Sequence, residues 1–309
     1  MNKKLAIGVD LGGTNLRTAL VTSEGTIIRK KKEPTSERLL NSLVSLIESL
    51  FSKDVAGIGL GVAGLIDRAS GTVLHSPNIP VLNGVNLIKE MNSKFKIPVF
   101  IENDANVAAL GEKWIGSGKE FSDFVLFTLG TGIGGGIIKG NRLLTVAAEV
   151  GHMTIRADGE KCFCGNSGCL ETTASARAII SKVISSLERE RESMLRQLKG
   201  GNFYKLTAED IYRAALEGDS LAREVLKEAG RGLGIGIANI INILSPQAII
   251  LMGGLIGAWD IYMQEAIKEA SKRAFRELFD GVKIIPSLLG DDAGVIGSAG
   301  LVFQECKEL

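Results

Sequence analysis

Short apolar runs alternate with amphipathic stretches along the first part of the chain. Residues 5–10 are apolar apart from a glycine and the final aspartate, which predicts a buried strand. Leucine and isoleucine at helical spacing predict a helix over 37–51, and a second helix follows at 105–114. The other strands that the pattern predicts here span 16–21, 26–31, 55–62 and 99–102. Strands and helices interspersed in this way are typical of the α/β class.

The same pattern starts again near residue 124. A strand at 124–128 is followed by a glycine-rich stretch at 129–136 and by a strand that includes 137–138, just as a glycine turn follows residues 5–10. A unit repeated so far along the chain predicts two related domains rather than a short-period repeat. We expect an N-terminal domain of residues 1–117 plus 295–309 and a second domain of residues 118–294.

The rest of the chain is predominantly helical in pattern. A strongly charged run at 188–199 is interpreted as the solvated face of a helix. A strand at 248–251 leads into Gly253-Gly254. Helices are predicted from about 175 onward, at 208–217, at 220–244 and at 293–306.

Composition excludes several classes of protein. Thirty-six lysines and arginines against 35 aspartates and glutamates give a net charge of +1, which argues against a broadly basic nucleic-acid-binding surface. A hydrophobic fraction of 45% supports a sizeable core and excludes intrinsic disorder. We find no apolar run long enough for a membrane span and no signal-like segment, so we expect a cytoplasmic protein without a membrane partner.

The two glycine-rich loops are candidates for phosphate binding. Residues 130–135 match the dinucleotide fingerprint, but a strand follows them where that fingerprint requires a helix, so a Rossmann site is rejected. Hairpin amides, with the hydroxyls of Thr14 and Thr131, can instead face phosphate oxygens. Asp10, at the end of the first strand, is placed to hold Mg²⁺ through water. Either loop alone could be an ordinary tight hairpin, whereas two matched loops favour phosphate binding.

A cluster of cysteines indicates a metal site. Cys162, Cys164 and Cys169 lie within eight residues, and His152 precedes them by ten. Three thiolates and an imidazole form a closed tetrahedral Zn²⁺ site of structural type, which we favour over a redox pair. Cys306 lies far along the chain and is interpreted as a core thiol.

Five motifs, taken in order, carry a family resemblance. They are Asp10-Leu11-Gly12-Gly13-Thr14-Asn15, Glu102-Asn103-Asp104-Ala105-Asn106, the glycine loop 130–136, Glu149-Val150-Gly151-His152 and the cysteine segment 162–171. The set resembles the ROK family of bacterial sugar kinases and repressors, most closely its glucokinases. This resemblance implies the actin-like or hexokinase-like ATPase fold, with two related domains and a cleft between them. It also implies that ATP is bound by Asp10, Gly12, Gly13, Thr14, Asn15, Gly130, Thr131, Gly132, Gly253 and Gly254.

The resemblance also assigns the chemistry. From sequence position alone, Asp104 could be either a helix N-cap or a general base, and the resemblance implies that it is the base. Sugar contacts are implied for Gly64, Asn78, Asn103, Asp104, Glu149, His152 and Glu171. A tryptophan that often follows the Asn78 segment in related kinases is missing here, which leaves the hexose open.

The sequence therefore predicts ATP-dependent phosphorylation of a hexose at its 6-hydroxyl, with glucose as the leading acceptor and with Mg²⁺ and a structural Zn²⁺. An N-acetylmannosamine, N-acetylglucosamine or fructose kinase is the alternative enzyme. A sugar-responsive repressor is disfavoured, because only nine residues precede Asp10 and leave no room for a helix-turn-helix. The phosphoryl donor (ATP, ADP or polyphosphate) stays open, and the resemblance implies a homodimer.

Overall fold

A computed structural model describes residues 4–308, with side chains to residue 306. The chain divides into two compact units. Unit 1 is formed from Met1–Leu126, Gly136–Ala148 and Ser287–Leu309, and unit 2 from Phe127–Gly135 and Glu149–Pro286. The domain limits expected from sequence, at 117/118 and 294/295, stay a prediction. Each unit is described separately below.

Unit 1 is built on a five-stranded sheet with the order β3-β2-β1-β4-β7. Strands β1 and β2 pair antiparallel through the first glycine turn, whereas β4 runs parallel to β1 and β7 parallel to β4. A small two-stranded sheet joins β5 and β6. The strands are β1 (Leu5–Leu11), β2 (Asn15–Thr22), β3 (Ile27–Pro34), β4 (Val55–Val62), β5 (Leu65–Asp67), β6 (Thr72–His75) and β7 (Val99–Asn103).

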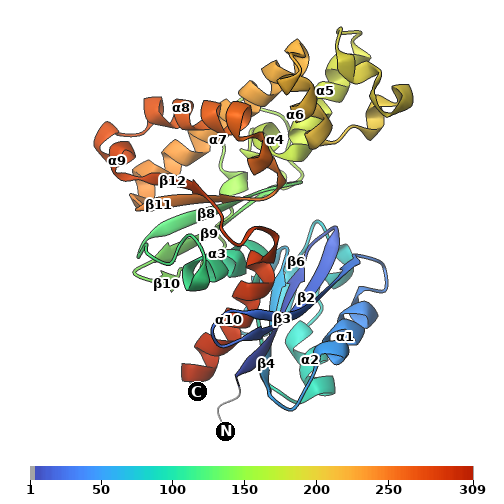
Figure 1. The fold of residues 1–309 in the computed structure, drawn as a ribbon, viewed down its shortest axis with the longest axis vertical. Coiled ribbons are helices and arrows are strands. Elements are labelled where there is room, and N and C mark those ends of the chain that lie inside the picture. The colour runs from blue at the N-terminus through green and yellow to red at the C-terminus, as the bar shows by residue number, and fades with distance from the viewer. Residues whose placement is uncertain (1–3, 309) are drawn as a thin grey trace. The chain divides into compact units, whose positions relative to one another are not determined.

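Helices cover both faces of the five-stranded sheet, as Figure 1 shows for α1 and α10. Alternate residues of β1 divide between two cores: Ile7 and Val9 pack with α1 and α2, whereas Ala6 packs with α10. Because successive side chains of a strand point to opposite faces of the sheet, β1 contributes apolar side chains to a core on each face. The helices are α1 (Leu39–Leu50), α2 (Leu87–Phe95), α3 (Asp104–Ile115) and α10 (Ala293–Glu308), with a 3-10 turn at Pro80–Leu82 and another at Gly290–Asp292.

Helix α10 lies unusually close to the sheet. A Cβ added to Gly8 of β1 would collide with the Val295 carbonyl, and one added to Gly59 of β4 would collide with the Ser298 carbonyl. The Ser298 hydroxyl also donates a hydrogen bond to the carbonyl oxygen of Val9, at 2.8 Å. Glycine at these strand positions is therefore required by the close approach of the helix backbone.

A second five-stranded sheet has the order β10-β9-β8-β11-β12. Its strands are β8 (Phe124–Leu129), β9 (Ile133–Lys139), β10 (Arg142–Leu143), β11 (Ala248–Met252) and β12 (Lys283–Pro286). The helices of unit 2 are α4 (Glu171–Ala174), α5 (Ala176–Glu188), α6 (Ala208–Leu216), α7 (Ser220–Leu244), α8 (Gln264–Arg273) and α9 (Arg276–Gly281). Short helical turns span Val150–His152, Met194–Arg196, Leu198–Gly201, Phe203–Lys205, Gly254–Ala258 and Trp259–Met263.

The interpretation of the charged run 188–199 as a helix face is wrong. Helix α5 ends at Glu188, and Glu190 adopts a left-handed φ of 60° that breaks the helix. Beyond it, the Asp219 carboxylate accepts hydrogen bonds from the Ser193 hydroxyl at 2.7 Å and from the Met194 N–H at 2.8 Å. A buried carboxylate from elsewhere in the chain thus overrides the local helix preference of the charged residues.

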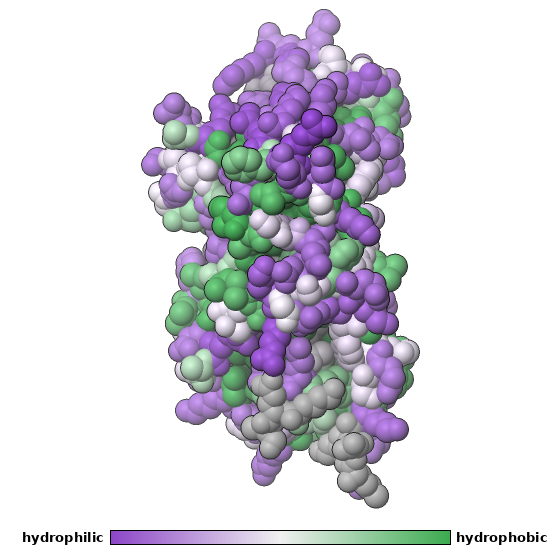
Figure 2. Space-filling view, turned by 90° about the vertical axis from the view of Figure 1, so that its left-hand side faces the viewer, coloured by the Kyte–Doolittle hydropathy of each residue, from purple (hydrophilic) through white to green (hydrophobic). Residues whose placement is uncertain are grey.

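The surface mixes polar and apolar groups. On the face shown in Figure 2, hydrophobic residues lie in groups among hydrophilic ones. Within the described residues, no helix is both long and apolar enough to span a bilayer.

Candidate active site and metal cluster

The first glycine hairpin places Asp10 beside a cation. Asp10 in β1 lies opposite Arg17 in β2, and the two form an ion pair with 3.1 Å between Arg17 Nη1 and Asp10 Oδ2. Arg17 Nη2 also lies 3.1 Å from Asp291 Oδ2. Burial raises the pKa of Asp10 above its usual range, and the neighbouring Arg17 opposes that rise. Arg17 was not among the site residues predicted from the sequence, although the register of a hairpin centred between Gly13 and Thr14 places it opposite Asp10.

Two candidate sugar contacts lie close to other predicted site residues of unit 1. A Cβ on Gly13 would lie 2.7 Å from the Asn78 Cβ, so Asn78 packs against the first hairpin. Gly64 has a φ of +138°, and its carbonyl oxygen accepts a hydrogen bond from the Asn103 side-chain amide at 3.1 Å. The structure thus brings Asn78 to Gly13, and Gly64 to the residue before Asp104.

Asp104 is the first residue of α3, but it is not the N-cap. The N-cap is Asn103, whose Oδ1 accepts hydrogen bonds from the N–H groups of Ala105 at 2.9 Å and Asn106 at 3.2 Å. Asp104 Oδ1 also accepts a hydrogen bond from the Ala105 N–H at 2.9 Å, and Asp104 is partly buried. Asn103 is therefore the N-cap of α3, and Asp104 shares with it only the Ala105 N–H.

The second glycine loop, Gly130–Gly132, connects β8 to β9, so the strand predicted after the fingerprint is present. The Gly130 N–H donates to the Gly132 carbonyl at 3.0 Å, which closes the turn. Gly253 has a φ of +103°, and a Cβ there would collide with the Leu129 carbonyl at the end of β8. Gly253, one of the residues for which the resemblance implies ATP binding, therefore lies beside the second hairpin.

Glu171, at the start of α4, contacts this hairpin. Its Oε2 accepts a hydrogen bond from the Ile133 N–H at 2.8 Å, and a Cβ on Gly132 would collide with the same oxygen. Glu149 lies near Glu171 and His152: burial raises the pKa of Glu149, His152 lowers it and the Glu171 charge raises it. Within unit 2 the candidate sugar residues Glu149, His152 and Glu171 are thus gathered near the second hairpin.

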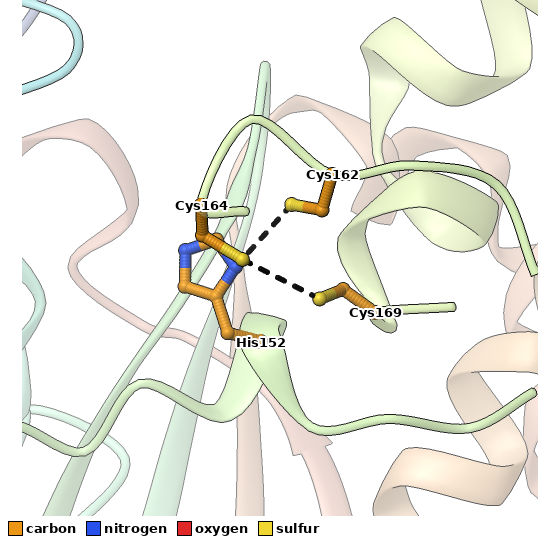
Figure 3. Close-up of side chains that lie close together, drawn as sticks. All are labelled: His152, Cys162, Cys164 and Cys169. Carbon is orange, nitrogen blue, oxygen red and sulfur yellow. Dashed lines mark hydrogen bonds between the residues drawn. The ribbon is translucent and has the colours of Figure 1, made fainter. Parts of the chain in front are cut away.

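The four predicted metal ligands converge, as Figure 3 shows for their side chains. The ligand atoms of His152, Cys162, Cys164 and Cys169 all lie within 4.8 Å of one another. Cys164 Sγ is 3.7 Å from Cys169 Sγ, and Cys162 Sγ is 3.6 Å from His152 Nδ1. Zn–S bonds of about 2.3 Å in a tetrahedron separate the sulfurs by about 3.8 Å, so the residues fit a zinc ion.

The surroundings of the three thiols shift their pKa values in different directions. Burial and hydrogen bonds with Cys164 and Cys162 raise the pKa of Cys169 to about 12. Burial likewise raises the pKa of Cys162, whereas a hydrogen bond with the Asn166 backbone lowers that of Cys164. Zinc binding would release the proton of each ligating thiol, so the affinity of the cluster for zinc should rise with pH. The cluster would fix the loop that ends two residues before Glu171.

Comparison with known proteins agrees with these features. The model of the ROK family matches residues 6–305. The chain belongs to the ROK family. A glucokinase of Halalkalibacterium halodurans is 35% identical over 321 residues, which cover 99% of this chain and 97% of the relative. A xylose repressor of Caldicellulosiruptor bescii is 36% identical over 314 residues, which cover 97% of this chain and 78% of the repressor.

The fold of this ROK protein is similar to that of a solved ROK family structure. The ROK family glucokinase from Streptomyces griseus, in complex with glucose and AMPPNP, aligns with a TM-score of 0.83 and 34% identity over 97% of this chain and 99% of that one. The predicted fold class, a hexokinase-like α/β sugar kinase fold, is confirmed.

Proposed function

We propose that the chain transfers the γ-phosphoryl group of ATP to the 6-hydroxyl of a hexose, with glucose as the leading acceptor. Its glucokinase relatives and the structure solved with glucose and AMPPNP support the substrates. Xylose repressors match the same region, so similarity alone does not decide catalysis. The observation that carries the proposal is Asp104, a carboxylate in the first turn of α3 whose capping function is already supplied by Asn103.

In the proposed reaction, the Asp104 carboxylate takes the proton of the 6-hydroxyl. The hydroxyl oxygen forms a bond to the γ-phosphorus, and the bond from that phosphorus to the bridging oxygen breaks to release ADP. A transfer of this kind needs positioning and charge stabilisation more than covalent catalysis. The family resemblance supports Gly64, Asn78, Asn103, Glu149, His152 and Glu171 as the residues that would bind the sugar hydroxyls.

The phosphates would be bound by the two glycine hairpins. The hairpin amides and the Thr14 and Thr131 hydroxyls offer donors to phosphate oxygens. The first hairpin supplies Asp10, Gly12, Gly13, Thr14 and Asn15. The second supplies Gly130, Thr131 and Gly132, with Gly253 and Gly254 beside it for the adenosine.

Asp10 is the residue that would hold Mg²⁺, through water. A Cβ on Gly294 would come within 2.9 Å of the Asp10 Cγ, so the carboxylate packs against this glycine, and its oxygens are donors that suit this cation. When bound, Mg²⁺ neutralises phosphate charge. The zinc cluster has a structural role in this scheme and takes no part in the transfer.

Thiolate ligands suit a reducing compartment, so we propose that the protein acts in the cytoplasm. We propose a homodimer from the family resemblance alone. Size-exclusion chromatography with light scattering would measure the oligomer.

A coupled assay with purified protein tests the proposed function. It compares glucose, mannose, fructose, N-acetylglucosamine and N-acetylmannosamine as acceptors, each with ATP, ADP and polyphosphate as donors. We expect glucose and ATP to give the highest kcat/KM, with the phosphate on the 6-oxygen by NMR. Specific binding of operator DNA with no phosphorylation of any hexose would overturn the proposal and indicate a repressor.

A further inference from the structure

Glu102 is a buried carboxylate for which the proposed reaction has no use. It lies in β7, two residues before Asp104, and is only 3% exposed. Ionised groups are rarely buried without compensation, because their desolvation costs several kcal/mol. The contacts of Glu102 therefore show what this charge does.

One carboxylate oxygen fixes the segment that carries Asp104. Glu102 Oε1 accepts hydrogen bonds from the Asn103 N–H at 2.8 Å and from the Asn106 side-chain amide at 3.0 Å. Asn106 is itself buried, and its amide also donates to the Val146 carbonyl at 3.3 Å. Oε1 thus holds the backbone immediately before Asp104 and a side chain in the first turn of α3.

The other oxygen depends on an arginine from a separate segment. Arg68 Nε lies 2.8 Å from Glu102 Oε2, and among the described residues Oε2 has no hydrogen-bond donor aligned with it. Among the described residues, the positive charge of the Arg68 guanidinium therefore compensates the negative charge at Oε2. Arg68 follows β5, and Gly64, just before β5, binds the Asn103 side chain. The β5 segment and the Asn103 segment are thus joined at two points.

We propose that Glu102 and Arg68 are positioning residues, whose ion pair, buried at Glu102 and partly exposed at Arg68, holds the backbone of Asn103 and the first turn of α3 so that the Asp104 carboxylate meets the acceptor hydroxyl. This inference rests on the proposed function. A buried ion pair contributes little net stability compared with apolar side chains of similar volume, whereas its directional contacts fix geometry. A displacement of about 1 Å in a reacting group can cost on the order of a hundredfold in rate.

Four variants test the pair: Glu102→Gln, Arg68→Met, the double variant and Arg68→Lys. Glu102→Gln keeps the Oε1 acceptor and removes the charge. We expect kcat to fall about 10- to 100-fold in each of the first two, with the KM for ATP within about twofold of wild type. The double variant should lose no more than the worse single variant, because the two residues act as one unit. Arg68→Lys, which keeps the charge, should recover part of kcat.

Two further measurements separate positioning from a general loss of structure. Hydrogen exchange should increase locally over residues 103–106 in Glu102→Gln, while exchange in α7 stays as in wild type. The matched control is Arg213→Met, which removes an exposed arginine paired with Glu209 and should leave kcat unchanged.

The outcomes distinguish this inference from the proposed function. If the wild type phosphorylates a hexose but the Glu102 and Arg68 variants keep wild-type kcat, or lose activity only in proportion to the unfolded fraction, the positioning role is overturned and the proposed function stands. If the wild type phosphorylates no hexose, the proposed function fails and this inference fails with it.

Discussion

Glu171 Oε2 accepts a hydrogen bond of 2.8 Å from the backbone N–H of Ile133, so the residue two positions after the last cysteine of the metal cluster contacts the second glycine hairpin. This single bond links the zinc loop, a candidate sugar ligand and a candidate phosphate loop. Disturbance at one of these three is therefore expected to reach the others.

Gly132→Ala tests that link. The added methyl group would collide with Glu171 Oε2 and break the bond to Ile133. We expect the KM values for sugar and for ATP to rise together, on the order of tenfold or more. The control is Gly281→Ala, where a Cβ meets no atom within 4 Å and should leave both constants unchanged. A rise in the KM for ATP alone would show that Glu171 does not bind the sugar.

Cys164→Ser tests the metal cluster. Removal of one thiolate from a closed tetrahedral site should reduce zinc, measured by elemental analysis, from about one per chain toward zero. The sugar KM should rise strongly, because His152 and the loop before Glu171 lose their anchor. Cys306→Ser, in α10 and outside the cluster, should keep the wild-type zinc content. Zinc-free wild-type protein would contradict the assignment.

Asp104→Asn separates the base from the cap. The amide cannot take the proton, so kcat should fall about 10²- to 10⁴-fold while sugar and ATP still bind in calorimetry. Thermal stability should change little, because Asn103 caps α3. Asn103→Ala, by contrast, should cost about 1 kcal/mol of stability. Asp280→Asn, an exposed aspartate, is the control, and wild-type turnover in Asp104→Asn would place the base elsewhere.

Asp10→Asn should raise stability and lower activity. Burial raises the pKa of Asp10 in the folded state, so its contribution to stability is fully present below the unfolded pKa and is lost as pH rises through the folded pKa. Asparagine has no ionisable carboxyl, so the variant does not lose this stability as the pH rises. The Tm of the variant, measured by calorimetry, should therefore exceed that of wild type by more at about pH 8 than at about pH 4.

The activity of Asp10→Asn should fall in the same preparation, and its requirement for Mg²⁺ should increase. A Tm difference that is independent of pH would show that the Asp10 charge does not oppose folding. An unchanged Mg²⁺ dependence would instead contradict the assignment of the first hairpin to phosphate and Mg²⁺ binding.

The sequence was sufficient for features set by local pattern and spacing. The strand, glycine turn and strand around Asp10 and the four metal ligands could be predicted, because hairpin register and ligand spacing are short-range properties. Arg68 could not be predicted, since it meets Glu102 only after two separate strands have folded. Asn103 as the cap in place of Asp104 could not be predicted either, because neighbouring polar residues compete for one helix terminus and only the backbone angles decide between them.

The close packing of α10 on β1 and β4 has a consequence for biosynthesis. Gly8 and Gly59 accept a helix backbone that is translated near the end of the chain, after all of unit 2. Strands β1 and β4 leave the ribosome before α10, so one apolar face of these strands stays uncovered until α10 is synthesised. The long segment Glu149–Pro286 is complete before that point. Nascent chains stalled before Ala293 should accordingly be the ones that chaperones hold and proteases cut, with cleavage concentrated in the N-terminal strands.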